Sequence, residues 1–232
     1  MEAIILAGGL GTRLRNTVAG LPKPMAPVNG KPFLFHILNW LKEYPLDKIV
    51  ISTGYVSELI IEYFGNRFNG IPIEYTIEQI PLGTGGAIRF AMQKCKGDNF
   101  LVLNGDTYYP VELDKFITFH TERKSMFSLV LKPMRAFSRY GSVECKGDTI
   151  ERFVEKKQCD DGLINGGLYL INRSFFESQN LKEVFSVEKD VLEKNAGSGV
   201  IRCMVSDKPF IDIGIPEDYE RAGDFMKSIL KH

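Results

Sequence analysis

Ala3-Ile4-Ile5-Leu6-Ala7-Gly8-Gly9-Leu10-Gly11-Thr12-Arg13-Leu14 begins as an uncharged apolar run and then turns abruptly glycine-rich. The apolar part predicts a strand that is buried on both faces of a parallel sheet. Glycines lack a Cβ, so successive backbone amides can approach an anion, and Arg13 and Lys23 can neutralise its charge. The stretch therefore predicts a strand followed by a loop that holds a polyphosphate. A tight turn with two solvated cations is the simpler alternative.

The glycine spacing excludes two common phosphate loops. The dinucleotide fingerprint, started at Gly9, needs a glycine where Leu14 stands. The P-loop needs Gly-Lys followed by Ser or Thr, which is absent from this stretch. A third kind of phosphate loop is therefore expected.

The glycine motif, followed by Pro22-Lys23-Pro24, resembles the signature of the sugar-1-phosphate nucleotidyltransferases, and the resemblance continues to nearly the last residue. Pro22-Lys23-Pro24-Met25-Ala26-Pro27-Val28 and Gly30-Lys31-Pro32-Phe33 are most similar to the D-glycero-D-manno-heptose 1-phosphate guanylyltransferases. Leu14-Arg15-Asn16-Thr17-Val18 departs from the commoner family pattern. The resemblance implies two substrates, a nucleoside triphosphate (GTP in that subgroup) and a sugar 1-phosphate, with Mg²⁺ as cofactor.

Composition argues against several other classes. The 29 basic and 29 acidic side chains cancel, so no global field attracts nucleic acid or a membrane. We expect a cytoplasmic protein, because there is no signal-peptide pattern and no apolar run that approaches about 18 residues. The four cysteines are widely spaced and the three histidines form no ligand pattern, which favours reduced thiols and argues against a zinc site.

Apolar runs alternate with helical spacing in the first half of the chain. Strands are expected at 3–7, 48–53, 71–75 and 99–103. One helix is expected to begin at residue 33, a second to cover 57–64 with Ser57 as its cap, and a third to cover 85–95. This alternation implies right-handed crossovers and a mostly parallel sheet. Ligands bind at the carboxyl ends of the strands of such sheets.

The rhythm changes after residue 116. A helix to 124 and a strand at 126–132 precede shorter β-like pieces at 141–145, 149–155 and 167–171, and helices at 188–195 and 217–230 flank a strand at 199–205. Pattern and resemblance together predict an α/β, Rossmann-like, three-layer nucleotidyltransferase fold (GT-A-like) with a mostly parallel mixed sheet and a smaller sugar-binding lobe. We expect one domain, 1–232, whose residues 1–115 mainly bind nucleotide and whose residues 116–232 mainly bind sugar phosphate. Without a hexapeptide repeat, the protein is expected to be a monomer or homodimer.

Two aspartates are the candidate metal ligands. Asp106 directly follows the predicted strand at 99–103, at the ligand-binding edge of the sheet. Mg²⁺ takes a few carboxylates together with water and phosphate oxygens, so a second carboxylate is expected. Asp212 stands in Asp212-Ile213-Gly214-Ile215-Pro216, which matches a late Asp-x-Gly-x-Pro element of the family. Either aspartate alone would be read as a turn or a helix cap, but the resemblance implies that together they bind Mg²⁺.

The resemblance also assigns residues to each substrate. Glu78 and Leu82-Gly83-Thr84-Gly85-Gly86-Ala87 would lie against base and ribose, where glycine permits close backbone approach, although the segment alone reads as a loop and helix start. Glu155 would accept hydrogen bonds from the sugar, and Lys156 would contact its phosphate. Glu188-Lys189-Asp190 is interpreted as a helix start. The implied site comprises catalytic Arg13, Lys23, Asp106 and Asp212; nucleotide-binding Leu6, Ala7, Gly8, Gly9, Gly11, Thr12, Arg13, Lys23, Glu78, Gly83, Thr84 and Gly105; and sugar-phosphate-binding Gly141, Glu155, Lys156, Asn165 and Gly166.

The implied reaction needs no protein nucleophile. A phosphate oxygen of the sugar 1-phosphate attacks the α-phosphorus of the triphosphate and pyrophosphate leaves, so the protein aligns the reactants and stabilises charge. Three alternatives stay open: a sister enzyme for mannose 1-phosphate or for UTP or dTTP, a metal-dependent glycosyltransferase, and a non-catalytic sensor of nucleotide sugars. Asp106-Thr107-Tyr108 lacks the second carboxylate of the glycosyltransferase Asp-x-Asp element.

Overall fold

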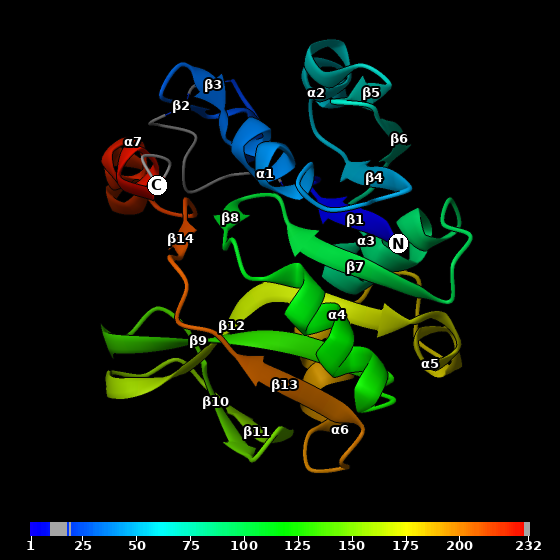
Figure 1. Cartoon of the computed structure of the whole chain (residues 1–232), viewed down its shortest axis with the longest axis vertical. Coiled ribbons are helices and arrows are strands. Elements are labelled where there is room, and N and C mark those ends of the chain that lie inside the picture. The colour runs from blue at the N-terminus through cyan, green and yellow to red at the C-terminus, as the bar shows by residue number, and fades with distance from the viewer. Residues whose placement is uncertain (10–17, 19, 230–232) are drawn as a thin grey trace.

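A ten-stranded sheet crosses the part of the chain that the computed structural model describes, residues 1–9, 18 and 20–229 (Figure 1). Its strands, in spatial order, are β10 (Ser142–Lys146), β11 (Thr149–Val154), β13 (Ile201–Val205), β9 (Phe127–Phe137), β12 (Cys159–Asn172), β7 (Asn99–Asn104), β1 (Glu2–Leu6), β4 (Lys48–Thr53), β6 (Ile71–Ile77) and β5 (Arg67–Phe68). Two short ladders lie beside it, β8 (Thr107–Tyr108) with β14 (Ile211–Asp212) and β2 (Pro27–Val28) with β3 (Lys31–Pro32).

The helices cover both faces of the sheet. They are α1 (Phe33–Leu41), α2 (Ser57–Phe64), α3 (Gly83–Met92), α4 (Leu113–Glu122), α5 (Arg173–Ser178), α6 (Glu193–Asn195) and α7 (Pro216–Ile229), with a 3₁₀ turn η2 (Lys23–Met25) and a π-helix η3 (Val187–Leu192). None of the helices in the described ranges is long and apolar enough to cross a bilayer.

The sheet is mixed, and its parallel part comes mainly from the first half of the chain. β6, β4, β1 and β7 pair in parallel, whereas β12 pairs antiparallel with both β7 and β9. In the second half, β13 and β9 form a further parallel pair. The expected crossovers through α1, α2 and α3 therefore build a parallel centre, and β12 joins it to the antiparallel lobe.

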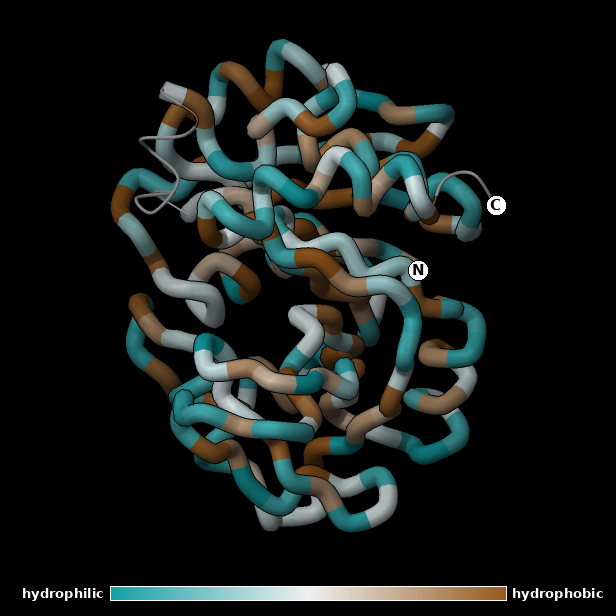
Figure 2. Tube along the Cα trace, turned by 90° about the vertical axis from the view of Figure 1, so that its left-hand side faces the viewer, coloured by the Kyte–Doolittle hydropathy of each residue, from teal (hydrophilic) through white to brown (hydrophobic). Residues whose placement is uncertain are grey.

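β1 shows why the molecule has three layers. Its side chains alternate between the two faces of the sheet. Ala3 and Ile5 belong to the apolar core beneath α1, α2, α4 and α7, whereas Ile4 belongs to the core beneath α3, α5 and η3. All three residues are fully buried, as predicted for a strand covered on both faces. Figure 2 shows apolar stretches running through the middle of the molecule.

Most predicted elements are confirmed, and the differences have local causes. Ser57 begins α2 but does not cap it; Val56 is the capping residue, with a positive φ of 55° and no side-chain cap bond. The predicted helix at 188–195 is a π-helix that continues into α6. The two-residue strands β8 and β14 escaped prediction because so short a pairing leaves no period in the sequence.

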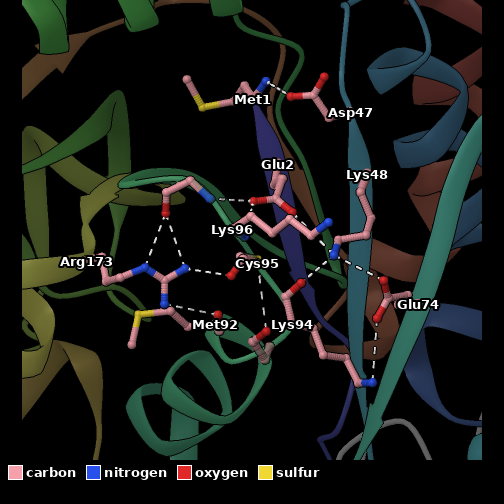
Figure 3. A network of polar contacts seen from close by, with 12 residues as sticks. Met1, Glu2, Asp47, Lys48, Glu74, Met92, Lys94, Cys95, Lys96 and Arg173 are labelled. Carbon is pink, nitrogen blue, oxygen red and sulfur yellow. Dashed lines mark hydrogen bonds and ion pairs between the residues drawn. The ribbon is translucent and has the colours of Figure 1, made fainter.

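A polar network closes the sheet at the amino ends of its parallel strands (Figure 3). Lys48 of β4 pairs with Glu2 of β1 and Glu74 of β6, and its ammonium donates to the Lys94 carbonyl beyond the end of α3. Arg173 donates to the carbonyls of Met92, Cys95 and Gly97. Burial raises the pKa of Glu2, but the backbone amides of Gly97 and Lys96 and the Lys48 ammonium outweigh it and lower the pKa overall. Cations therefore cap the C-terminus of α3 and leave the opposite sheet edge for ligands.

The last helix returns to the first half of the chain. The Tyr219 hydroxyl of α7 donates to the Pro27 carbonyl at 2.8 Å, and the Asn29 amide donates to the Gly223 carbonyl at 2.8 Å. These contacts hold the β14–α7 segment beside the β2–β3 ladder, next to the ligand-binding edge.

His120 of α4 generates a prediction about stability and pH. Its ring contacts the Ser128 hydroxyl at 2.8 Å, and burial lowers its pKa from 6.5 to about 4. As the pH falls, His120 is protonated in the unfolded chain before it is protonated in the folded protein. The contribution of neutral His120 to the free energy of unfolding is therefore complete above pH 6.5 and is lost as the pH falls toward 4. We expect His120→Gln to reduce the loss of unfolding free energy across this range by about 2–3 kcal/mol, measured by urea unfolding. An identical pH dependence in the two proteins would contradict this.

Candidate active site

The carboxyl ends of the parallel strands enclose a cavity of about 430 Å³. Ala7 continues β1 by donating to the Ser52 carbonyl at 2.7 Å, and Gly105 donates to the Leu6 carbonyl at 2.8 Å. These bonds fix the turns that follow β1 and β7 at one edge of the sheet. The cavity is lined by Leu6, Ala7, Gly8, Gly9, Lys23, Pro24, Glu78, Pro81, Gly83, Thr84, Ala87, Asn104 and Asp106.

Glu78 lines one wall of this cavity and holds it in place through two hydrogen bonds. One carboxylate oxygen accepts from Ser52 at 3.3 Å, and the other accepts from the Leu82 amide at 3.0 Å. A Cβ on Gly8 would lie 2.5 Å from Glu78 Oε1. Gly8 thus lets the chain pass close to this carboxylate, which in turn holds the loop before α3.

The glycines before and within α3 serve the packing of this chain itself. Gly83 has a φ of +72°, and a Cβ there would lie 2.5 Å from the Phe185 carbonyl oxygen. A Cβ on Gly85 would lie 2.1 Å from the Phe185 ring, and one on Gly86 would lie 2.5 Å from the Glu183 carbonyl oxygen. We expected glycine here to permit close approach to a base. The described contacts give Gly85 and Gly86 a different use, the docking of the segment that precedes η3.

Lys23 and Asp106 form an ion pair across the cavity. Lys23 opens the turn η2, directly after Pro22, and its Nζ lies 3.1 Å from Asp106 Oδ2. Their side chains are 20% and 30% exposed, so both groups can still contact a ligand. The pair places an ammonium group beside a carboxylate in the lining of the cavity.

A two-residue ladder brings Asp212 to Asp106. Asp212 is paired with Thr107 between β14 and β8, and the Ile213 amide donates to the Asp106 carbonyl at 3.0 Å. The Gly214 amide donates to Asp212 Oδ1 at 2.6 Å, and a Cβ on Gly214 would lie 2.8 Å from that oxygen. This close approach explains the glycine of the Asp-x-Gly element.

The Asp106 and Asp212 carboxylates repel each other, and the cations Lys23 and Arg139 lie close to them. Burial and the charge of Asp106 raise the pKa of Asp212, whereas the Gly214 amide, Arg139 and Lys23 oppose that rise. Arg139 Nη2 lies 3.3 Å from Asp212 Oδ2, and the same guanidinium pairs with Asp218 of α7. The site therefore attracts positive charge to the point where Asp106 and Asp212 converge.

A second cavity, of about 240 Å³, has Asp212 in its lining. Asn165 reaches it from an irregularity in β12, where the register with β9 shifts between Asn165 and Tyr169. A Cβ on Gly166 would lie 2.5 Å from the Tyr109 ring, and one on Gly167 would lie 2.5 Å from the Asn104 amide. The cavity is lined by Arg139, Tyr140, Gly141, Lys156, Asn165, Asp212, Gly214 and Ile215.

The structure brings most of the predicted site residues to these two cavities. Gly105 and Gly166 lie in neither lining and pack against Leu6 and Tyr109. Glu155 is exposed after β11 and is also in neither lining. Gly11, Thr12 and Arg13 lie outside the described residues.

Sequence reasoning missed several lining residues. Arg139 stands two residues before the predicted site residue Gly141, but its pairing with Asp212 and Asp218 has no local sequence signal. Asn104, which ends β7 two residues before Asp106, could have been found from its position at a strand end.

The chain belongs to the nucleotidyl transferase family, whose profile matches residues 2–228. It is 49% identical to the D-glycero-alpha-D-manno-heptose 1-phosphate guanylyltransferase of Aneurinibacillus thermoaerophilus, over 96% of each chain. The enzyme of the same name from Campylobacter jejuni is 44% identical, over 94% of this chain and 97% of that protein. HddC from Yersinia pseudotuberculosis, solved alone and complexed with GMP-PN, superposes with a TM-score of 0.86 at 36% identity, covering 97% of this chain and 99% of HddC.

The packing of Gly85 against Phe185 generates a prediction about stability. Gly85→Ala is expected to lower the free energy of unfolding by about 1–3 kcal/mol, because the added methyl group overlaps a buried ring. Gly9→Ala is the matched control: no atom of the described residues lies within 4 Å of its Cβ position, so the free energy of unfolding should change by less than about 0.5 kcal/mol.

Denaturant unfolding of Gly85→Ala in a Phe185→Ala background tests the cause. There the clash is absent, and the cost of the added methyl group should disappear. An equal cost in both backgrounds would rule out the Phe185 ring as its source.

Proposed function

We propose that this protein is a sugar-1-phosphate guanylyltransferase that condenses GTP with D-glycero-α-D-manno-heptose 1-phosphate, giving the GDP-sugar and pyrophosphate. The observation that carries the proposal is the meeting of two cavities at a pair of aspartates. Asp106 lines the larger cavity, Asp212 lines the smaller one, and a backbone hydrogen bond joins their segments. The names of the relatives support the choice of guanine as the base and of the heptose as the sugar.

The larger cavity is assigned to the nucleotide. Gly8 and Gly9 lie at its wall, and Lys23 brings an ammonium beside Asp106. In the reaction, Lys23 would contact the α-phosphate and the incoming sugar phosphate, holding attacking oxygen and phosphorus in line. Arg13, outside the described residues, is proposed to bind the departing pyrophosphate.

The smaller cavity is assigned to the sugar phosphate. Lys156, Asn165 and Gly141 line it together with Asp212, whose segment is hydrogen-bonded to that of Asp106. A phosphate monoester is already anionic near neutral pH, so its oxygen attacks without a general base. Glu155, Gly166 and Gly105 remain proposed substrate contacts from the family resemblance, as do the nucleotide and sugar-phosphate halves of the chain.

The donor set fits Mg²⁺. Among the described residues no cluster of three or more His, Cys, Asp or Glu side chains could hold a metal, but Mg²⁺ is bound through one or two carboxylates plus substrate phosphates. Burial and the Asp106 charge raise the pKa of Asp212, so a cation there would relieve a repulsion that the fold creates. Asp106 and Asp212 are therefore proposed as ligands. Bound Mg²⁺ would supply charge neutralisation at the phosphates.

Pyrophosphate release with a matrix of substrates tests the proposal. GTP, UTP, dTTP and ATP are each paired with the 1-phosphates of D-glycero-D-manno-heptose, mannose and glucose, with Mg²⁺ or with excess EDTA. We expect the highest kcat/KM for GTP with the heptose 1-phosphate and no turnover in EDTA. Preference for UTP or dTTP would contradict the guanylyl assignment. Preference for mannose 1-phosphate would contradict the heptose assignment. Release from no pair would support a non-catalytic sensor.

Lys23→Ala tests the assigned cation. Loss of an ammonium that stabilises transition-state charge should lower kcat by about 10²- to 10³-fold while leaving the melting temperature nearly unchanged. Lys115→Ala is the matched control, because Lys115 pairs with Glu112 at 2.9 Å on an exposed face of α4, and its kcat should stay at the wild-type value. A folded Lys23→Ala protein with wild-type kcat would refute the role of Lys23.

A further inference from the structure

Glu188 contacts the wall of the nucleotide cavity from the first turn of the π-helix η3. Its Oε2 accepts from the Thr84 hydroxyl at 2.6 Å and from the Ser186 hydroxyl at 2.7 Å. Thr84 in turn accepts from the Val187 amide at 2.9 Å, and Ser186 accepts from the Lys189 amide at 3.3 Å. The contact with Thr84 joins residues that are 104 positions apart in the chain.

The same carboxylate reaches toward the sugar-phosphate cavity through Tyr169. Tyr169 is fully buried in β12, and its pKa is raised by burial and by the charge of the nearby Glu188 carboxylate. The hydroxyl oxygen accepts from Asn165 Nδ2 at 2.9 Å. Asn165 Oδ1 accepts from the Gly167 amide at 3.0 Å, and Asn165 lines the smaller cavity.

The direction of these hydrogen bonds follows from the chemistry of a carboxylate. A carboxylate only accepts, so the Thr84 hydroxyl donates to Glu188, and the same carboxylate is the charged acceptor next to the buried Tyr169 hydroxyl. The Tyr169 oxygen is then left to accept, which requires the NH₂ group of Asn165 rather than its carbonyl. The Gly167 amide needs an acceptor, which fixes Asn165 Oδ1 on that side. The Glu188 carboxylate and the Gly167 amide thus favour the same orientation of the Asn165 side chain.

We propose that Glu188 is a positioning residue that orients Thr84 in the nucleotide cavity and, through Tyr169, Asn165 in the sugar-phosphate cavity. This inference rests on the proposed function, because it takes the two cavities as the sites of the two substrates. It gives Glu188 a role beyond the helix start that its sequence context indicates, and that start is formed separately by the Ser186 side chain.

Glu188→Gln tests the proposal while nearly conserving shape. A glutamine amide can donate as well as accept, so the direction in which the Thr84 and Tyr169 hydroxyl protons point is no longer fixed. We expect KM for the sugar 1-phosphate to rise about tenfold and KM for GTP to rise about threefold, with a smaller change in kcat. Glu193→Gln, an exposed glutamate that follows the same π-helix, should keep both KM values.

Tyr169→Phe separates the effect of Glu188 on the sugar-phosphate cavity from its effect on the nucleotide cavity. It removes only the hydroxyl, so KM for the sugar 1-phosphate should rise by about the same factor as in Glu188→Gln, while KM for GTP stays at the wild-type value. In the Tyr169→Phe background, Glu188→Gln should raise the sugar-phosphate KM no further. A general loss of packing would instead lower the melting temperature and act additively.

Two results would overturn the inference. One is an unchanged sugar-phosphate KM in folded Glu188→Gln; the other is equal, additive effects of Glu188→Gln in the wild-type and Tyr169→Phe backgrounds. The wild-type enzyme is assayed first with GTP and the heptose 1-phosphate. Absence of wild-type turnover counts against the proposed function, whereas wild-type turnover with unchanged variant KM values counts against Glu188 alone.

Discussion

The parallel pairing of β1 with β4 and β7 is the constraint on which the rest of the structure depends. Its register sets Leu6 level with Ser52 on one side and with Asn104 on the other. β6 continues the parallel set beyond β4, and the chain leaves β1, β7 and β6 at one edge, so the glycine turn, Asp106 and the Glu78 loop surround a single cavity. At the opposite ends, Lys48 and Arg173 satisfy the carbonyls around the end of α3, which keeps that edge closed.

The candidate active site combines charges from distant parts of the chain. Asp106 and Lys23 come from the parallel half, whereas Asp212 and Arg139 come from the lobe that follows β9. The short β8–β14 ladder holds the two aspartates together against their mutual repulsion, and α7 braces the returning segment through Pro27 and Asn29. Backbone hydrogen bonds and packing thus offset an electrostatic cost that a bound cation would relieve.

The glycine-rich segments illustrate how far local sequence can be interpreted. Gly9 lines the cavity with no described atom within 4 Å of its Cβ position, whereas Gly8 accommodates Glu78, and Gly85 and Gly86 accommodate Phe185 and Glu183 of the same chain. Both uses depend on the missing Cβ, so the residue type alone does not distinguish a ligand from a neighbouring segment. Only the fold shows which of them occupies the space.

The sequence by itself determined the buried strands, the crossovers between them and the family signature, because periodicity and turn chemistry are local properties. It also placed Lys23, Asp106 and Asp212 as candidates through their motifs. Only the tertiary structure decided that Asp212 lies beside Asp106, that Arg139 pairs with Asp212, and that Glu188 accepts a hydrogen bond from Thr84. Those contacts join residues many positions apart. Their geometry follows from strand register and packing, which no short stretch of sequence encodes.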